Sequence, residues 1–164
     1  MARSKGIGFF GFLLGNRVNL TIDEADKYRL FHSDADRERI LGAIFSGKTH
    51  LSFLAHEVKR WKSEKEEHDR EIALLHKTVE LNHKGIALEK EGQVSDAIEV
   101  YEENIKSDYP ASHSYKRLSV LYRKQKDFDN EERVIKRAIE ILPRDKEYFG
   151  DRLSKCIRLR EKQK

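Results

Sequence analysis

The chain has 164 residues, of which 38% are charged, and it contains two prolines. This length suits one domain, or one domain with an appendage, and so few prolines leave room for long helices. A hydrophobic share of 38% is small for a compact globule but suits a stack of helices in which each unit contacts only its neighbours. A single cysteine, Cys156, excludes a disulfide-rich scaffold and a cysteine-rich zinc site. We therefore expect an all-α, soluble protein.

Charge is unevenly distributed along the chain, whose net charge is +4. Residues 1–48 carry a net charge of +2, residues 49–110 carry −5 and residues 111–164 carry +7. An acidic middle and a basic C-terminal third allow head-to-tail self-association, an acidic protein partner or nucleic acid.

The first residues imitate the start of a secretory signal peptide, because two basic side chains in Met1–Lys5 precede the apolar run Gly6–Gly15. This run is short for such a signal, and no cleavage site of the Ala-x-Ala kind follows it. It is also far below the roughly 20 residues that span a bilayer. We therefore predict a cytoplasmic protein without an integral membrane span.

Residues 1–20 are compatible with two structures. Gly8–Leu14 and Val18–Ile22 suit a β-hairpin, because Gly15-Asn16 between them is a turn pair. The same residues equally suit an apolar arm that packs on helices.

Residues 21–77 are expected to form the N-terminal helices. Thr21 and Ser33 each precede an acidic residue by three positions, a capping pattern that predicts helices near residues 22–31 and 34–45.

The segment Gly47–Lys77 is also predicted to be helical, with an apolar stripe made of Leu51, Leu54, Val58 and Trp61. Ser63 has a capping pattern of its own. Either a new helix begins there and continues into Leu88, or one unbroken helix extends from residue 50 to residue 91.

The segment Gly42–Thr49 matches the phosphate-loop pattern G-x-x-x-x-G-K-[ST]. That chemistry requires a buried strand before the loop, whereas Asp34–Leu41 is charged and helix-like. We interpret the match as one helix that ends at Ser46-Gly47 and another that begins at Thr49. The seven histidines lack the spacing of metal ligands, and no nucleophile–base set is evident. We therefore expect no enzyme activity, no catalytic residue, no metal and no cofactor.

A period of 34 residues relates two segments in the second half of the chain. It aligns large apolar residues at helical spacing: Leu81 with Tyr115, Leu88 with Tyr122, Val94 with Phe128, Tyr101 with Ile135, and Ile105 with Ile139. The turns inside the two units fall at Gly92 and Lys126, and glycine readily takes the left-handed conformation that ends a helix. Ser95 is expected to cap the helix after Gly92. Pro110 and Pro143 mark the unit ends, since proline cannot continue a helix.

The two units resemble the tetratricopeptide repeat (TPR), whose pattern is W-x2-L-G-x2-Y, then A-x3-F, then A and P. The resemblance rests on Leu81, Gly85, Leu88, Gly92, Ala97, Tyr101 and Pro110 in the first unit, and on Tyr115, Leu118, Tyr122, Ala138 and Pro143 in the second. It implies a superhelix of helical hairpins, with two repeats over residues 78–144 (78–111 and 112–145, approximately). A C-terminal capping helix and basic tail follow in residues 146–164. Asn104 and Glu131 stand where the pattern has alanine, and either is able to loosen its hairpin.

The resemblance also implies a binding surface, because the first helix of each TPR unit lines the concave side of the stack. The corresponding residues are Asn82, Ile86 and Glu89 in the first unit, and His113, Lys116, Arg117, Val120, Arg123 and Lys124 in the second. The second set is basic, which suits an acidic or carboxylate-ended peptide. The other interpretation is that Lys116, Arg123 and Lys124 are solvated residues of a helix face.

We therefore expect a non-enzymatic adaptor that binds a peptide or helix of another protein, with self-association compatible with that role. One alternative is a nucleic-acid-binding protein that uses the basic C-terminal third, although it contains no recognised motif. A third is a peripheral membrane adaptor held by residues 6–14.

Overall fold

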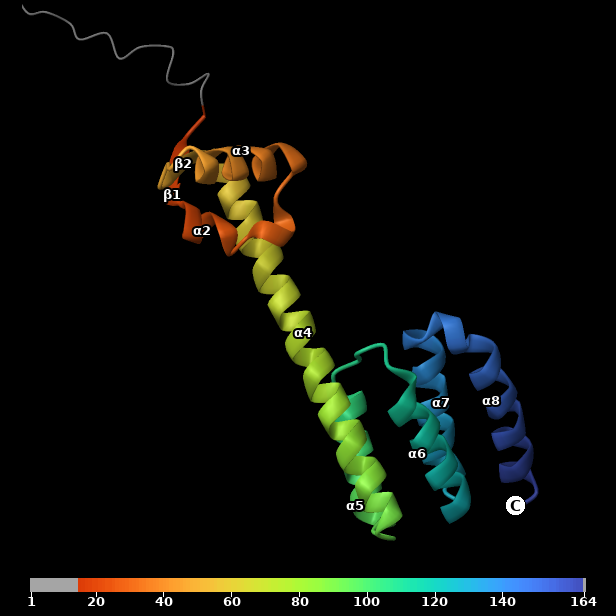
Figure 1. Cartoon of the computed structure of the whole chain (residues 1–164). Helices are drawn as coiled ribbons and strands as arrows, with labels where there is room; N and C mark the ends of the chain where they lie inside the picture. Colours follow the sequence, from red (N-terminus) through yellow and green to blue (C-terminus); the bar gives the residue numbers. More distant parts are fainter. Residues whose placement is uncertain (1–14, 164) are drawn as a thin grey trace, which may run out of the picture. The chain divides into compact units, whose positions relative to one another are not determined.

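The computed structural model describes residues 15–163, which are mostly helical and include a small two-stranded sheet (Figure 1). The chain divides into two compact units, Met1–Arg70 and Glu71–Lys164. The helix α4, Ala55–Lys90, contains the boundary between them. The predicted helical class is confirmed, but the all-α prediction is wrong for the sheet. Within residues 15–163, no helix is both long and apolar enough to cross a membrane.

The first unit contains short elements that precede α4: β1 (Arg17–Thr21), α2 (Ile22–Asp26), a 3-10 turn (Arg29–Phe31), α3 (Asp34–Phe45) and β2 (His50–Leu54). The two strands are antiparallel, and Arg17 lies opposite Leu54 while Thr21 lies opposite His50. The strand that the hairpin alternative placed at Val18–Ile22 is present as β1, one residue earlier, and its partner in the described part of the chain is β2. The other predicted half of that hairpin, Gly8–Leu14, lies outside the described residues.

Both predicted helix caps in this unit are confirmed. The Thr21 hydroxyl accepts a hydrogen bond from the Glu24 amide at 3.1 Å, and the Glu24 carboxylate accepts one from the Thr21 amide at 2.8 Å. Ser33 caps α3 by accepting from the Asp36 amide. The helix expected near residues 22–31 is broken, because α2 ends at Asp26 and a 3-10 turn follows.

The predicted helix over Gly47–Lys77 is wrong at its start, where His50–Leu54 form a strand. The helical interpretation of the Gly42–Thr49 segment is therefore correct for α3 but wrong for a helix beginning at Thr49. Pairing with β1 satisfies the backbone groups of β2 and turns Phe53 into the core. From Ala55 onward α4 is unbroken to Lys90, so Ser63 does not begin a helix.

Trp61 forms the centre of the core of the first unit and is fully buried. Its ring centroid lies 5.1 Å from that of Phe53 and 4.5 Å from that of His32. One side of α3 is packed in the first unit, but its other side is open to solvent, where Phe45 at the end of the helix is 88% exposed.

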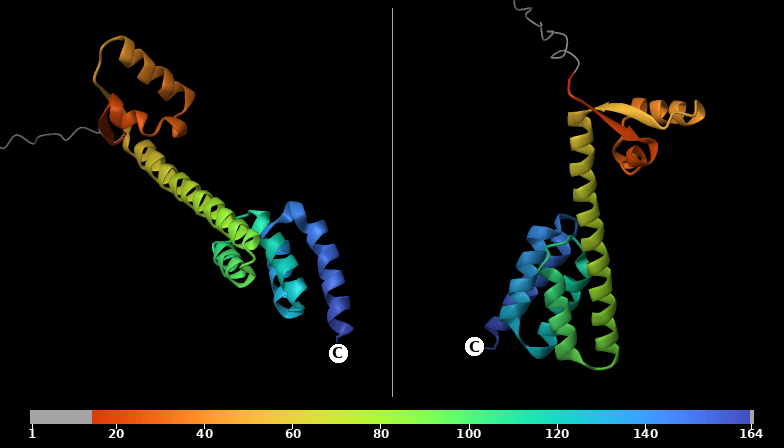
Figure 2. Two further views of the ribbon diagram at one scale, coloured as in Figure 1. Left: turned by 60° about the horizontal axis from the view of Figure 1, so that its bottom comes forward. Right: turned by 90° about the vertical axis from the view of Figure 1, so that its left-hand side faces the viewer.

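The second unit contains the last part of α4, then α5 (Val94–Ile105), α6 (Ser112–Gln125), α7 (Phe128–Ile141), a 3-10 turn (Pro143–Asp145) and α8 (Lys146–Glu161). Consecutive helices of the series from α5 to α8 pack on each other, and Figure 2 shows them from two further sides. Side-chain contacts also join α4 to α6 and α6 to α8, while others join α5 to α7. The helix expected within residues 146–164 is present as α8, and Phe149 and Cys156 on it are fully buried.

The hairpin between α4 and α5 depends on a small residue at its crossing. A methyl group at Gly85 would collide with the ring of Tyr101. The turn residues Gly92 and Lys126 both have left-handed backbone conformations, with φ of +78° and +60°. Ser95 does not cap α5, because this helix already begins at Val94.

The two polar departures from the repeat pattern, Asn104 and Glu131, are buried and bonded. The amide nitrogen of Asn104 lies 3.1 Å from the Thr78 carbonyl oxygen and 2.9 Å from Oγ of Ser114. Oε2 of Glu131 accepts a hydrogen bond from Nε of Arg123 at 3.1 Å, and the two side chains form an ion pair. Each residue therefore forms polar contacts between neighbouring helices. An alanine at the same position would allow the helices to pack closely but would form no such contact.

Candidate functional site

The structure places the binding residues predicted in the second repeat on one face of α6. Counting from His113, the residues recur at helical spacings of three, four and seven, which brings them to the same side. The set consists of His113, Lys116, Arg117, Val120, Arg123 and Lys124, and we refer to it as the α6 face. Lys124 is exposed and the other five are half-buried, so the face is accessible along its length.

On the α4 side, Glu89 and Arg117 connect this face to the preceding helix. The guanidinium Nε of Arg117 donates to the Glu89 carboxylate at 2.8 Å, and the hydroxyl of Tyr101 donates to the same carboxylate at 2.9 Å. These bonds, led by that of Arg117, hold the pKa of Glu89 below its usual value, and burial and Glu89 raise the pKa of Tyr101.

A hollow of about 390 Å³ opens beside this pair and is lined by Ile86, Glu89, Lys90, His113 and Arg117. Burial lowers the pKa of His113, so its imidazole is mainly neutral at pH 7. Its Nε2 atom is buried and has no hydrogen-bond partner among the described residues. The hollow therefore combines an apolar wall, a compensated ion pair, a neutral ring and the exposed ammonium group of Lys90.

Asn82 has a structural role, because its side chain is hydrogen-bonded to neighbouring helices. Its side-chain oxygen accepts from the amide of Asn104 at 2.9 Å and from the Ser114 hydroxyl at 2.7 Å. These bonds tie α4, α5 and α6 together, so Asn82 positions the helices that carry the face.

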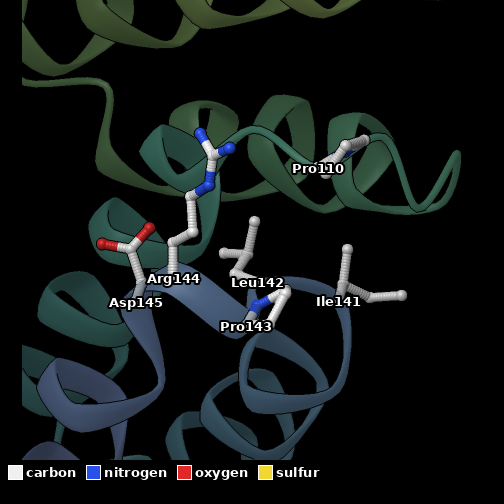
Figure 3. Close-up of a pocket in the computed structure, with 6 residues that line it drawn as sticks. All are labelled: Pro110, Ile141, Leu142, Pro143, Arg144 and Asp145. Carbon is white, nitrogen blue, oxygen red and sulfur yellow. The ribbon is translucent and has the colours of Figure 1, made fainter.

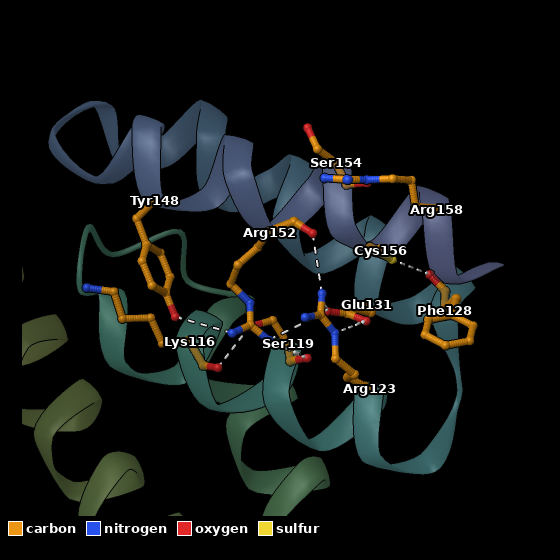
Figure 4. A network of polar contacts seen from close by, with 10 residues as sticks. All are labelled: Lys116, Ser119, Arg123, Phe128, Glu131, Tyr148, Arg152, Ser154, Cys156 and Arg158. Atoms are coloured by element: carbon orange, nitrogen blue, oxygen red, sulfur yellow. Dashed lines mark hydrogen bonds and ion pairs between the residues drawn. The ribbon is translucent and has the colours of Figure 1, made fainter. Parts of the chain in front are cut away.

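On the α8 side, Lys116 is held at the start of that helix. Its ammonium group lies 2.8 Å from the Asp145 carboxylate and 5.1 Å from the centre of the Tyr148 ring. Figure 4 shows Lys116 beside Tyr148 at one end of the contact network between α6 and α8.

Further along the same boundary, Arg123 reaches a fully buried carboxylate. The guanidinium of Arg123 binds both oxygens of Glu131, at 2.6 and 3.1 Å, and donates to the backbone oxygen of Arg152 at 3.3 Å (Figure 4). Arg152 lies 3.5 Å from the same carboxylate and donates to the Ser119 carbonyl oxygen. One carboxylate from α7 thus organises two guanidinium groups, one from α6 and one from α8.

Three of the four cations expected to make this face basic are therefore engaged within the molecule. Lys116, Arg117 and Arg123 each have a carboxylate partner. Lys124 is exposed and forms no ion pair with the rest of residues 15–163. The available positive charge is therefore displaced toward the C-terminal end of the face.

Sequence reasoning missed a second basic group at that end. A hollow of about 280 Å³ is lined by Arg123, by Lys155, Arg158 and Leu159 of α8, and by Lys162 directly after that helix. We call it the basic hollow. From the sequence, we interpreted these residues only as part of the C-terminal capping helix and basic tail. Their recurrence at spacings of three, four and seven was the available signal that they share one side of α8.

A third hollow, of about 270 Å³, lies where two inter-helix turns meet, and Figure 3 shows its lining side chains. These are Pro110, Ile141, Leu142, Pro143, Arg144 and Asp145. Both prolines that mark the unit ends are among them. Because Asp145 also binds Lys116, this hollow adjoins the N-terminal end of the α6 face.

A comparison with models of known protein families gave no match, and neither did a comparison with curated protein sequences. In the part of the chain that the structure describes, no three His, Cys, Asp or Glu side chains converge as metal ligands would. The predictions of a TPR relationship and of a non-enzymatic role stay predictions.

Proposed function

We propose that the second unit is a non-enzymatic, TPR-type protein-binding module that holds an acidic segment of another protein along the α6 face. The observation that carries the proposal is the position of this face. α4 flanks it on one side and α8 on the other, and a hollow opens at each boundary. Grooves between helices that combine apolar walls with a few polar groups are typical peptide sites.

The dimensions of the face suit a short peptide. α6 has 14 residues, and at 1.5 Å per residue it is about 21 Å long. An extended peptide advances about 3.3 Å per residue, so about six residues cover the face. Ile86 and Val120 supply half-buried apolar contacts, while Lys124 supplies an uncompensated charge. The internal ion pairs hold the remaining long side chains in place before binding, which lowers the entropy cost of binding.

Selection of ten-residue peptides from a random library on the immobilised full-length protein tests the proposal. We expect enrichment of peptides with Asp or Glu clusters. Their affinities are then measured by fluorescence anisotropy for the wild type and for Lys124→Glu. Reversal of an exposed charge in the face is expected to weaken binding by about three- to tenfold.

Lys84→Glu provides a matched control, because Lys84 is an exposed lysine of α4 without an ion pair among the described residues. It reverses the same charge away from the α6 face, and its effect reports net charge alone. Equal losses in Lys84→Glu and Lys124→Glu contradict the assignment of the face. Absence of any enriched peptide contradicts the function itself.

A further inference from the structure

The basic hollow concentrates positive charge without a carboxylate in its lining. Of its five lining residues, Arg123, Lys155, Arg158 and Lys162 are cationic, and Leu159 provides an apolar wall. Arg123 comes from α6, Lys155 and Arg158 come from α8, and Lys162 directly follows α8, so the fold brings the cations together from distant parts of the sequence.

Two of these cations are held in position by other groups. The guanidinium of Arg123 is fixed by both oxygens of Glu131 and by the carbonyl oxygen of Arg152. Nε of Arg158 donates to the Ser154 carbonyl oxygen at 3.2 Å. Guanidinium groups held in this way lose little further freedom when they bind an anion.

The charge of the hollow is compensated only in part, at Arg123. Glu131 is shared between Arg123 and Arg152, so one carboxylate faces two guanidinium groups. Lys155, Arg158 and Lys162 form no ion pair within residues 15–163.

The opposite side of α8 shows the contrast. There Arg160 binds Glu132 and Asp129 of α7, so the cation on that side is compensated. Asp151, one turn before Lys155, is exposed and is not part of the hollow. The negative end of the α8 dipole favours cations in its last turn, but this effect is weak at an exposed site and does not bring Arg123 or Lys155 there.

We propose that the basic hollow binds the dianionic phosphate of a phosphorylated serine or threonine in the acidic segment, an inference that rests on the proposed function. Two guanidinium groups and two ammonium groups match the charge and the several acceptor oxygens of a phosphate monoester better than those of one carboxylate. Leu159 contacts the carbon chain that carries the phosphate. Because Arg123 belongs both to the α6 face and to the hollow, the same peptide reaches both.

A nucleic acid fits this charge distribution less well. Its phosphates form a long row, and binding proteins neutralise many of them at once. Here the neighbouring cations Lys116 and Arg117 are already paired with carboxylates, so these two do not extend the uncompensated charge of the basic hollow along the face. Lys90, which forms no ion pair among the described residues, lines the separate hollow on the α4 side.

The test uses the full-length protein and a fluorescein-labelled ten-residue peptide with one serine among glutamates, in phosphorylated and unphosphorylated forms. We expect the phosphorylated peptide to bind about tenfold more tightly at physiological salt. Combining Lys155→Ala with Arg158→Ala is expected to abolish this difference and to leave the unphosphorylated peptide within about twofold of wild type. Lys84→Ala serves as the control, and circular dichroism checks that each variant is folded.

Each outcome is decisive. Equal affinity for the two peptides overturns the phosphate site and leaves the proposed function standing. If neither peptide binds, and about 20 mM inorganic phosphate gives no rise in melting temperature relative to chloride at equal ionic strength, the phosphate site is overturned as well. Single-stranded RNA that binds more tightly than the phosphopeptide, and loses affinity in the same double variant, overturns the site in favour of nucleic acid.

Discussion

Replacement of Glu131 by alanine separates the repeat pattern from the structure, because the two predict opposite results. The pattern has alanine at this position, so sequence similarity alone favours Glu131→Ala as neutral or stabilising. In the structure the carboxylate of Glu131 is fully buried and binds Arg123 and Arg152, whose side chains are only 27% and 16% exposed. The substitution therefore leaves two largely buried guanidinium groups without their carboxylate.

Removal of one partner from a buried ion pair costs about 3–5 kcal/mol. Partial exposure of both arginines allows water to compensate some of this loss, so we expect about 3 kcal/mol of lost unfolding free energy for Glu131→Ala. Urea denaturation followed by circular dichroism measures it, because the second unit is helical throughout. Trp61 belongs to the core of the first unit, and its fluorescence separately reports that unit.

Glu99→Ala is the matched control, because Glu99 is an exposed residue of α5 without an ion pair in the described part of the chain. We expect it to change stability by less than about 0.5 kcal/mol. Combining Glu131→Ala with Arg123→Met and Arg152→Met should recover most of the loss, because no unpaired charge then remains buried. If Glu131→Ala is as stable as Glu99→Ala, the account of this network is refuted.

Further predictions concern packing, reactivity and pH. Gly85→Ala should destabilise the protein by about 1–3 kcal/mol, because the added methyl group collides with Tyr101. Gly42→Ala should stabilise the protein slightly, because there is open space beside Gly42. Thermal melting of the two variants compares these effects. Burial raises the pKa of Cys156 to about 11, so iodoacetamide at pH 8 should modify it only after unfolding, and equal rates in native and denatured protein contradict this. Burial lowers the pKa of His113 below its unfolded value of 6.5, so the unfolded state binds the proton more strongly and the unfolding free energy should fall from pH 7.5 to pH 5.5. This fall should be smaller in His113→Gln, measured by urea titration at both pH values.

Local signals in the sequence predicted many of the helices and turns. Thr21 and Ser33 cap their helices through side chains only three residues away, which a sequence pattern records. Gly92 and Lys126 likewise end helices through a local backbone conformation. The strand at β2 was missed because its five residues have no local advantage as a strand, and pairing with the distant β1 decides their conformation.

The shared face of the candidate residues on α6 was predicted, but the pairing of their charges was not. The resemblance to the TPR pattern implied which side chains line one face, and their helical spacing along α6 brings them to the same side. Their carboxylate partners come from other helices: Glu89 from α4, Glu131 from α7 and Asp145 from the turn before α8. A single sequence does not reveal which side chains such distant segments bring together, so the face was expected to be more basic than it is.

Nuclear magnetic resonance of the ¹⁵N-labelled full-length protein with a selected acidic peptide tests the central claim most directly. We expect the largest shift changes at amides of α6 from His113 to Lys124, with smaller changes on the facing parts of α4 and α8. Lys124→Glu should reduce these changes at equal peptide concentration, and Lys84→Glu should not. Changes confined to α5 and α7, or to the first unit, contradict a binding site on the α6 face.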